Sequence, residues 1–252
     1  MNRLTAACLT PSATRASRER REPLRVASRL DQSQCLLAPL HYERNYAYPL
    51  LVWLHDDGGS ERELKRIMPL VSLRNYVSLA VRGTGDSSGG FAWADTPDAV
   101  LAAEIRVAEA VAAARQRFNV HASRVFLVGH GTGGTLATRL ALRSPERYAG
   151  GVSIGGPFPC GQSPLARLAA ARASRLLIMH CRDSFHYPID RLCDELGLFH
   201  AAGMSVTLRQ YPCGDELTTQ MLHDLDVWLM EQVTGIVTPE VAEPAPLPSD
   251  WN

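Results

Sequence analysis

A glycine-rich turn in the middle of the chain has the spacing of a catalytic strand–turn–helix motif. Residues 125–128 form an apolar run, residues 129–134 read Gly-His-Gly-Thr-Gly-Gly, and residues 135–143 have the composition of a helix that stops before Pro145. In the G-x-S-x-G motif, this layout exposes a serine hydroxyl on a sharp turn, where it serves as a nucleophile. Here the central residue is Gly131, so the motif is present without a nucleophilic side chain.

Polar side chains directly follow three other apolar runs of the chain. They are Asp56 and Asp57 after the first run, Asp183 and Ser184 after the second, and Asp215 after the third. The carboxyl ends of parallel strands meet at one edge of a sheet, where α/β proteins bind their ligands. We therefore expect these side chains and Gly131 to lie near one another.

The apolar runs alternate with helical patterns, which predicts an α/β fold with a mainly parallel central sheet and helices on both faces. The predicted strands are residues 36–42, 49–55, 76–81, 125–128, 151–154, 176–180 and 206–211. The predicted helices are residues 98–118, 135–143, 189–202 and 216–232. The first helix is expected to present one apolar stripe, formed by Leu101, Ile105, Ala108 and Ala112.

Four segments in this order resemble the phospholipase/carboxylesterase family of α/β-hydrolases. Residues 54–59 are similar to its HGxGG oxyanion loop, residues 82–83 and 89–93 to its RGP…GGxxW segment, and residues 144–150 to S/H-P-x-x-F-A-G. The likeness runs from about residue 36 to residue 232. It implies an α/β-hydrolase fold and an ancestry among enzymes that cleave carboxylic esters with a Ser-His-acid triad.

The triad positions implied by the resemblance hold other residues in this chain. The nucleophile position falls on Gly131, and the Y-P-x-x-G-H-E pattern aligns with residues 211–216, which places Asp215 at the histidine position. The acid position falls on Ser184, with Asp183 one residue early. A carboxylate is a far weaker base than imidazole at neutral pH. Loss of nucleophile or base costs roughly a million-fold in turnover.

The oxyanion hole implied by the resemblance is altered as well. Its two donors would be the backbone N–H groups of Asp57 and Thr132, and Asp56 stands where the family has glycine. A carboxylate about 4 Å from a developing oxyanion would repel it by up to ~4 kcal/mol at an effective dielectric of 20. Glycine at the elbow avoids the strain that a serine carries there, so we expect a positive φ at Gly131.

Three functions are compatible with this pattern. The first is a pseudoenzyme that keeps an acyl- or ester-type cleft and binds a small molecule there. The second is an active ester hydrolase with relocated groups, in the neighbourhood of Cys181, Cys213 and His186. The third is an interaction scaffold that acts through its tails. The spacing of these cysteines and histidines matches no metal motif, and neither a metal nor a cofactor is expected.

Composition indicates a globular chain and excludes some partners. Of 252 residues, 46% are hydrophobic and 21% charged, and the formal net charge is zero, which argues against binding nucleic acid through bulk charge. No apolar run is long enough to span a membrane, and the cytoplasm is the expected location. The expected organisation is a basic leader over residues 1–35, one domain over 36–235 and a Pro-rich tail over 236–252, with the oligomeric state left open.

Overall fold

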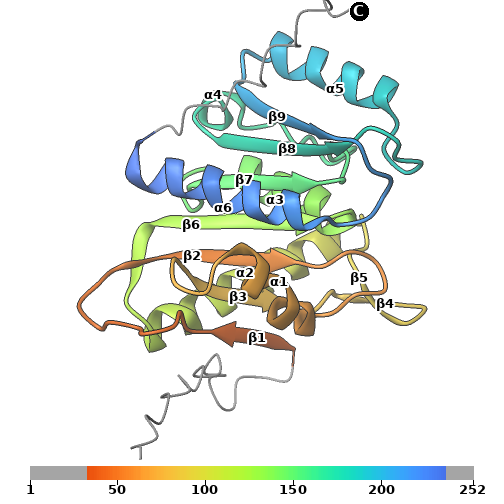
Figure 1. Cartoon of the computed structure of the whole chain (residues 1–252). Helices are drawn as coiled ribbons and strands as arrows, with labels where there is room; N and C mark the ends of the chain where they lie inside the picture. Colours follow the sequence, from red (N-terminus) through yellow and green to blue (C-terminus); the bar gives the residue numbers. More distant parts are fainter. Residues whose placement is uncertain (1–32, 237–252) are drawn as a thin grey trace, which may run out of the picture.

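The computed structural model describes residues 33–236, which form one seven-stranded sheet covered by helices (Figure 1). The strand order is β1-β3-β2-β6-β7-β8-β9. Only β1 runs antiparallel to its neighbour, and the remaining strands are parallel, so the predicted mainly parallel sheet is confirmed. The strands are β1 (Gln34–Leu37), β2 (Tyr48–Leu54), β3 (Val77–Val81), β6 (Val120–His130), β7 (Gly150–Ile154), β8 (Arg175–Cys181) and β9 (Val206–Tyr211).

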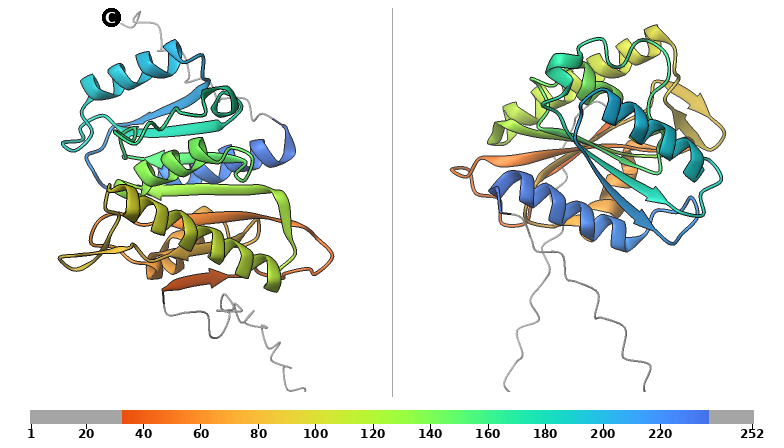
Figure 2. Two further views of the ribbon diagram at one scale, coloured as in Figure 1. Left: turned by 180° about the vertical axis from the view of Figure 1, so that it is seen from behind. Right: turned by 90° about the horizontal axis from the view of Figure 1, so that it is seen from above.

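Helices pack on both faces of this sheet (Figure 2). One face carries α2 (Pro97–Arg117), α3 (Thr132–Arg143), the short α4 (Leu168–Ala171) and α5 (Ile189–Ala201). The other face carries α1 (Leu64–Val71) and α6 (Thr219–Thr234). Each face of the sheet has its own hydrophobic core. Within β2, Val52 packs in the core on the first of these faces and Trp53 in the core on the other, because successive strand residues point to opposite faces. All of β2 is buried, which explains its continuous apolar sequence.

The apolar stripe predicted for α2 is wrong. Leu101 and Ile105 are 47% and 49% exposed. The buried residues are instead Val100, Ala103, Val107, Ala110, Val111 and Ala114. The sequence of α2 contains two overlapping apolar stripes. The helix packs through the one rich in alanine and valine, because small side chains let it approach the sheet closely.

Several element boundaries also differ from the predictions. Strand β1 ends at Leu37 instead of continuing to residue 42, since Pro39 cannot donate a hydrogen bond to the sheet. Helix α6 begins at Thr219 and not at residue 216. The Thr218 side chain caps this end of the helix by accepting the Met221 N–H. Neither α1 nor the 3₁₀ turn that precedes it, η1 (Glu61–Glu63), was predicted.

A small hairpin that was not predicted supports one loop at the carboxyl edge of the sheet. Strands β4 (Gly85–Ser87) and β5 (Gly90–Ala92) pair with each other. The Phe91 backbone exchanges hydrogen bonds of 3.0 and 2.9 Å with Gly58 and Gly59, in the loop after β2. The hairpin therefore holds the loop that contains Asp56 and Asp57.

The strand order reverses between β2 and β6, which makes this pair the topological switch point of the sheet. From β2 the chain proceeds to β3 on one side, and it later returns to β6 on the other. The loops that leave the two strands run in opposite directions there, and open α/β sheets bind ligands at such a point. Asp56 follows β2, and Gly131 follows β6. The fold thus places both residues at the expected site.

Candidate functional site

Gly131 forms a sharp turn between β6 and α3. Its φ is 52° and its ψ is −122°, so the predicted positive φ is confirmed. The Gly131 N–H donates to the carbonyl of Ile154 at 2.9 Å, and its own carbonyl accepts the N–H groups of Gly134 and Thr135 at 2.9 and 3.1 Å. The turn is fixed on both sides, in a conformation that L side chains adopt only with strain.

The Asp56 carboxylate occupies the space beside this turn. Its Oδ1 accepts the Thr132 N–H at 2.9 Å and lies 3.2 Å from the Thr132 hydroxyl. A Cβ added to Gly131 would lie 2.1 Å from the same oxygen. The carboxylate therefore fills the position of any side chain at residue 131 and uses an expected oxyanion donor. Its place at the N-terminus of α3 is favourable, because free N–H groups and the helix dipole stabilise negative charge there.

This arrangement was not predicted from the sequence. The prediction was that the Asp56 carboxylate lies about 4 Å from a bound oxyanion and repels it. In the structure the carboxylate instead binds the donor itself. Asp57, the other expected donor residue, is exposed and accepts the Thr132 hydroxyl at 3.0 Å through its side chain. The direction of the Asp56 side chain depends on its rotamer, which no sequence motif specifies.

The backbone of the Asp56 loop is held by a buried histidine. The ring of His55 donates from Nδ1 to the Asp56 carbonyl at 2.7 Å, since its Nε2 accepts the Gly83 N–H at 2.9 Å. The Trp93 indole donates to the His55 carbonyl at 2.7 Å. His55 is fully buried, and both ring nitrogens are engaged. It is a structural residue that fixes the loop and is not available as a base.

Ser184 and Asp215, the residues at the implied acid and base positions, lie side by side. The Ser184 hydroxyl donates to the Asp215 carboxylate and accepts the Tyr187 N–H at 2.8 Å. The Phe185 N–H also donates to Asp215, at 3.2 Å. Asp183 points elsewhere, with its exposed carboxylate 3.3 Å from Arg182. Of the two candidates for the acid position, Ser184 is therefore the one that contacts Asp215.

The surroundings of Asp215 keep it ionised. Burial by itself raises its pKa, but hydrogen bonds from Ser184 and from the Phe185 and His186 backbone outweigh burial and hold the pKa below its usual value. A carboxylate with a lowered pKa binds a proton poorly at neutral pH. Asp215 is thus suited to accept hydrogen bonds and unsuited to act as a general base.

The surroundings of Cys181 disfavour a nucleophilic role for its thiol. Cys181 is buried in the core beside α6, and burial, followed by a hydrogen bond with Cys213, raises the pKa of its thiol to about 12. Only the thiolate is a good nucleophile, so Cys181 is inert at neutral pH. His186 is exposed on the neighbouring loop. Within residues 33–236, no group of three or more His, Cys, Asp and Glu side chains is placed to hold a metal ion.

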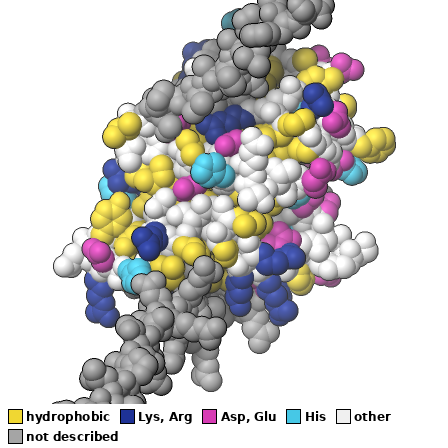
Figure 3. Space-filling view, viewed as in Figure 1, with side chains coloured by type: hydrophobic (Ala, Val, Ile, Leu, Met, Phe, Trp, Pro, Cys, Tyr) yellow, Lys and Arg dark blue, Asp and Glu magenta, His cyan; other side chains and the backbone are white. Residues whose placement is uncertain are grey.

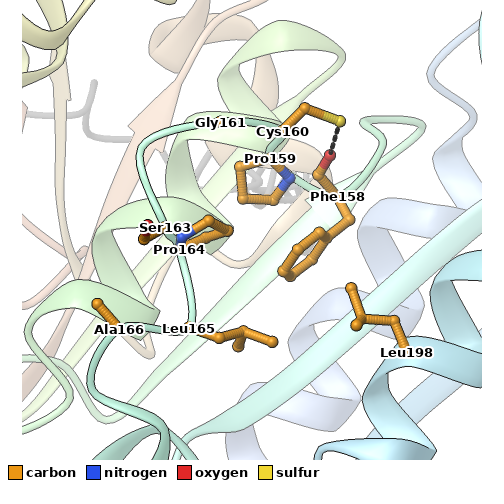
Figure 4. A pocket seen from close by; sticks show the side chains of 9 residues that line it. All are labelled: Phe158, Pro159, Cys160, Gly161, Ser163, Pro164, Leu165, Ala166 and Leu198. Carbon is orange, nitrogen blue, oxygen red and sulfur yellow. Dashed lines mark hydrogen bonds between the residues drawn. The ribbon is translucent and has the colours of Figure 1, made fainter.

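The structure contains an apolar pocket that was not predicted from the sequence. It has a volume of about 530 Å³ and lies between the loop after β7 and helix α5 (Figure 4). Its apolar lining comprises Phe158, Pro159, Pro164, Leu165, Ala166 and Leu198. The loop starts against the turn, since a Cβ on Gly156 would meet the Gly131 carbonyl at 2.1 Å. The run Pro157-Phe158-Pro159, apolar in a loop, was the available signal in the sequence.

Two buried charged side chains hold the pocket loop in place. Arg139 of α3 donates to the Cys160 carbonyl at 2.8 Å and pairs with Asp95 at 2.7 Å. Glu195 of α5 accepts the Phe158 N–H at 2.9 Å. Buried charges that are fully hydrogen-bonded fix the conformation of the segments they join. The pocket is therefore preformed.

None of the helices between residues 33 and 236 combines the length and apolarity that a membrane crossing requires. On the face seen in Figure 3, acidic, basic and apolar side chains are interspersed, in keeping with the zero net charge.

Comparison with solved structures identifies proteins with the same architecture. A carboxylesterase from Mesorhizobium loti superimposes with a TM-score of 0.68 at 19% sequence identity, over 83% of this chain and 99% of that chain. Arabidopsis thaliana SOBER1 superimposes with a TM-score of 0.63 at 20% sequence identity, over 74% of this chain and 100% of that chain. TT1662 from Thermus thermophilus superimposes with a TM-score of 0.62 at 19% sequence identity, over 83% of this chain and 99% of that chain. No family model matches the sequence. The chain therefore has the α/β-hydrolase fold, with carboxylesterases among its structural neighbours.

Proposed function

We propose that this chain is a carboxylesterase-like pseudoenzyme, which binds an apolar, acyl-type small molecule without hydrolysing it. The observation that carries the proposal is the hydrogen bond from the Thr132 N–H to the Asp56 carboxylate. In a serine hydrolase, an N–H at this position stabilises the oxyanion of the transition state. Here the donor already binds a permanent negative charge supplied by the chain.

An ester would meet two obstacles at this turn. Its carbonyl oxygen would have to displace Asp56 from Thr132, and a hydrogen bond to a charged group is worth about 1.5–3 kcal/mol. No side chain extends from Gly131 to attack the carbonyl carbon, and Asp215 is a poor base. The alternative of a relocated cysteine nucleophile is disfavoured by the raised pKa of Cys181.

The apolar pocket supports a binding role. Its volume of about 530 Å³ falls within the range of roughly 300–1,000 Å³ that is usual for small-molecule sites. Its walls are mostly hydrocarbon, so a ligand gains affinity in proportion to the apolar area it buries, at about 25 cal/mol per Å². Because Arg139 and Glu195 hold the loop, little ordering opposes binding. An acyl chain matches these features.

The absence of turnover is tested with nitrophenyl butyrate. We expect no saturable hydrolysis above the uncatalysed background. The matched protein is the Cys181→Ala/Cys213→Ala variant, which tests the second function considered above. A saturable rate in the unmodified chain that disappears in this variant would contradict the proposal and identify a cysteine hydrolase.

Binding is tested with dodecanoate by isothermal titration calorimetry. Leu198→Glu places a charge on the pocket wall, and we expect it to weaken binding at least about tenfold because that charge must be desolvated. Leu101→Glu is the matched control, since Leu101 is 47% exposed and Leu198 43%, and both lie on helices. Equal affinities for the two variants would show that dodecanoate does not use this pocket.

A further inference from the structure

A second cavity lies at the opposite, amino-terminal edge of the sheet. It has a volume of about 380 Å³. Its walls come from the first half of β6, the segment before β7, the start of β8 and the last turn of α6, which lie at one side of the molecule (Figure 1). Gly131 follows the other end of β6, so this cavity is separate from the elbow.

Three arginines line the cavity, and two of them have no carboxylate partner among residues 33–236. The Arg124 side chain, which is partly buried on β6, makes no hydrogen bond or ion pair within that part of the chain. Arg175, at the start of β8, donates only to the backbone carbonyl of Gln232, at 3.3 Å. Their positive charges are therefore not neutralised by neighbouring side chains.

The third arginine, Arg147, is only weakly paired. Its Nη1 lies 3.8 Å from Glu104, and the same carboxylate is 3.2 Å from Arg143. One acid thus serves two guanidinium groups. Because the pair is long and Arg147 is half exposed, it contributes little attraction. Arg147 is available to a ligand.

The remaining polar lining favours an anion. The single acid of the lining is Glu146, whose carboxylate is bound by Arg167 at 3.1 Å. Three arginines and one glutamate leave a formal charge of +2 on the walls. A guanidinium group donates hydrogen bonds and accepts none, so the ligand must be rich in acceptors.

We infer that this cavity is a binding site for the phosphate group of a small molecule. A phosphate monoester carries a charge of about −1.5 to −2 at neutral pH and three acceptor oxygens, which matches the charge and the donors of the walls. Arginine pairs with phosphate through two parallel hydrogen bonds, and one phosphate can contact several arginines. A carboxylate has one charge and two oxygens, so it would satisfy fewer of these donors.

The test uses inorganic phosphate and the full chain. Affinity is measured by calorimetry at constant ionic strength, with sodium chloride replacing phosphate in the reference titration. We expect saturable one-site binding, a loss of at least about tenfold in Arg124→Gln, and a smaller loss in Arg124→Lys, which keeps the charge. Since the Arg124 side chain makes no hydrogen bond or ion pair within residues 33–236, the variant should melt at the same temperature as the parent.

Arg66→Gln is the matched control, because it removes the same charge from an exposed position on α1. Equal losses in Arg124→Gln and Arg66→Gln would reduce the effect to bulk charge and overturn the proposal, as would absence of saturable binding. A further variant, Glu240→Gln/Glu243→Gln/Asp250→Asn, removes the acidic side chains of residues 237–252. Phosphate binding that becomes several-fold tighter in this variant would overturn the assignment to a free ligand. It would show instead that the acidic side chains of residues 237–252 compete for the cavity.

Discussion

Gly131 and Asp56 depend on each other. The φ of 52° at Gly131 suits glycine, and the absence of a side chain there leaves room for the Asp56 carboxylate. The carboxylate in turn accepts the Thr132 N–H, one of the N–H groups of the first turn of α3 that have no acceptor within the helix. A side chain at residue 131 must displace Asp56 towards solvent, and this breaks the contact with Thr132. The two positions are therefore energetically coupled.

Gly131→Ser should lower the free energy of unfolding by about 2–4 kcal/mol, from backbone strain and loss of the hydrogen bond to Asp56. In the Gly131→Ser/Asp56→Gly variant, we expect the loss to be smaller than the sum of the single losses by at least about 1 kcal/mol. Urea denaturation of the four proteins measures this coupling. Additive losses would mean that Asp56 is not displaced by the serine.

Neither variant should hydrolyse esters. Gly131→Ser supplies a hydroxyl, and Asp56→Gly frees the Thr132 N–H, but Asp215 still lacks the basicity of a histidine. Appreciable hydrolysis of nitrophenyl butyrate by the double variant would therefore reveal a base that we have not identified.

For individual residues, the sequence predicted which residues lie at the site better than it predicted where their side chains point. The glycine at the elbow, its positive φ and the proximity of Ser184 to Asp215 followed from strand ends and motif spacing. The occupation of the oxyanion donor by Asp56 did not follow, because it depends on one side-chain torsion. The apolar pocket likewise depends on the path of the loop after β7, which Arg139 and Glu195 fix through contacts distant in the sequence.

Among the elements, buried strands were the most predictable. Strands β2, β7 and β8 are mostly apolar because both faces of the sheet are covered, and their runs stand out in the sequence. Helix α1 was missed since it is short and contains Pro69. The β4–β5 hairpin has three-residue strands that are only partly buried, so its sequence lacks an apolar pattern.

The Ser184–Asp215 contact joins the loops that follow β8 and β9, and it makes stability depend on pH. The pKa of Asp215 is lower in the folded chain than its ordinary value. The contribution of Asp215 to the free energy of unfolding is therefore complete above the ordinary aspartate pKa. It is lost as the pH falls through the lower pKa of the folded state. We expect Asp215→Asn to reduce the fall in melting temperature over this acidic interval.

Asp86→Asn is the control for this measurement, since Asp86 is an exposed carboxylate on β4 and makes no hydrogen bond with another described side chain. Melting curves at closely spaced acidic pH values distinguish the variants. An identical pH dependence in Asp215→Asn and the parent would contradict the predicted role of the contact.

For the molecule as a whole, stability should reside in the two cores on either side of the sheet. Within residues 33–236, one hydrophobic cluster packs on each side of the sheet. The remaining segments, residues 1–32 and 237–252, are rich in Arg and Ser at one end and in Pro, Glu and Ala at the other. Such compositions provide few side chains to bury.

A chain trimmed to residues 33–236 should unfold cooperatively, with a melting temperature within a few degrees of the full chain. Limited proteolysis followed by mass spectrometry should yield a fragment close to these bounds. A trimmed chain that loses cooperative unfolding would assign a structural role to the segments outside them, including Trp251, which lies outside the described residues.

The contact of Asp56 with the Gly131–Thr132 turn also constrains the mutational routes open to this sequence. A serine introduced at position 131 while Asp56 is present collides with the carboxylate, and loss of Asp56 first removes a helix-capping contact without adding a nucleophile. Either first step is unfavourable, and neither yields an activity on which selection could act. We therefore expect aspartate at position 56 to occur together with glycine at position 131 among sequences related to this chain.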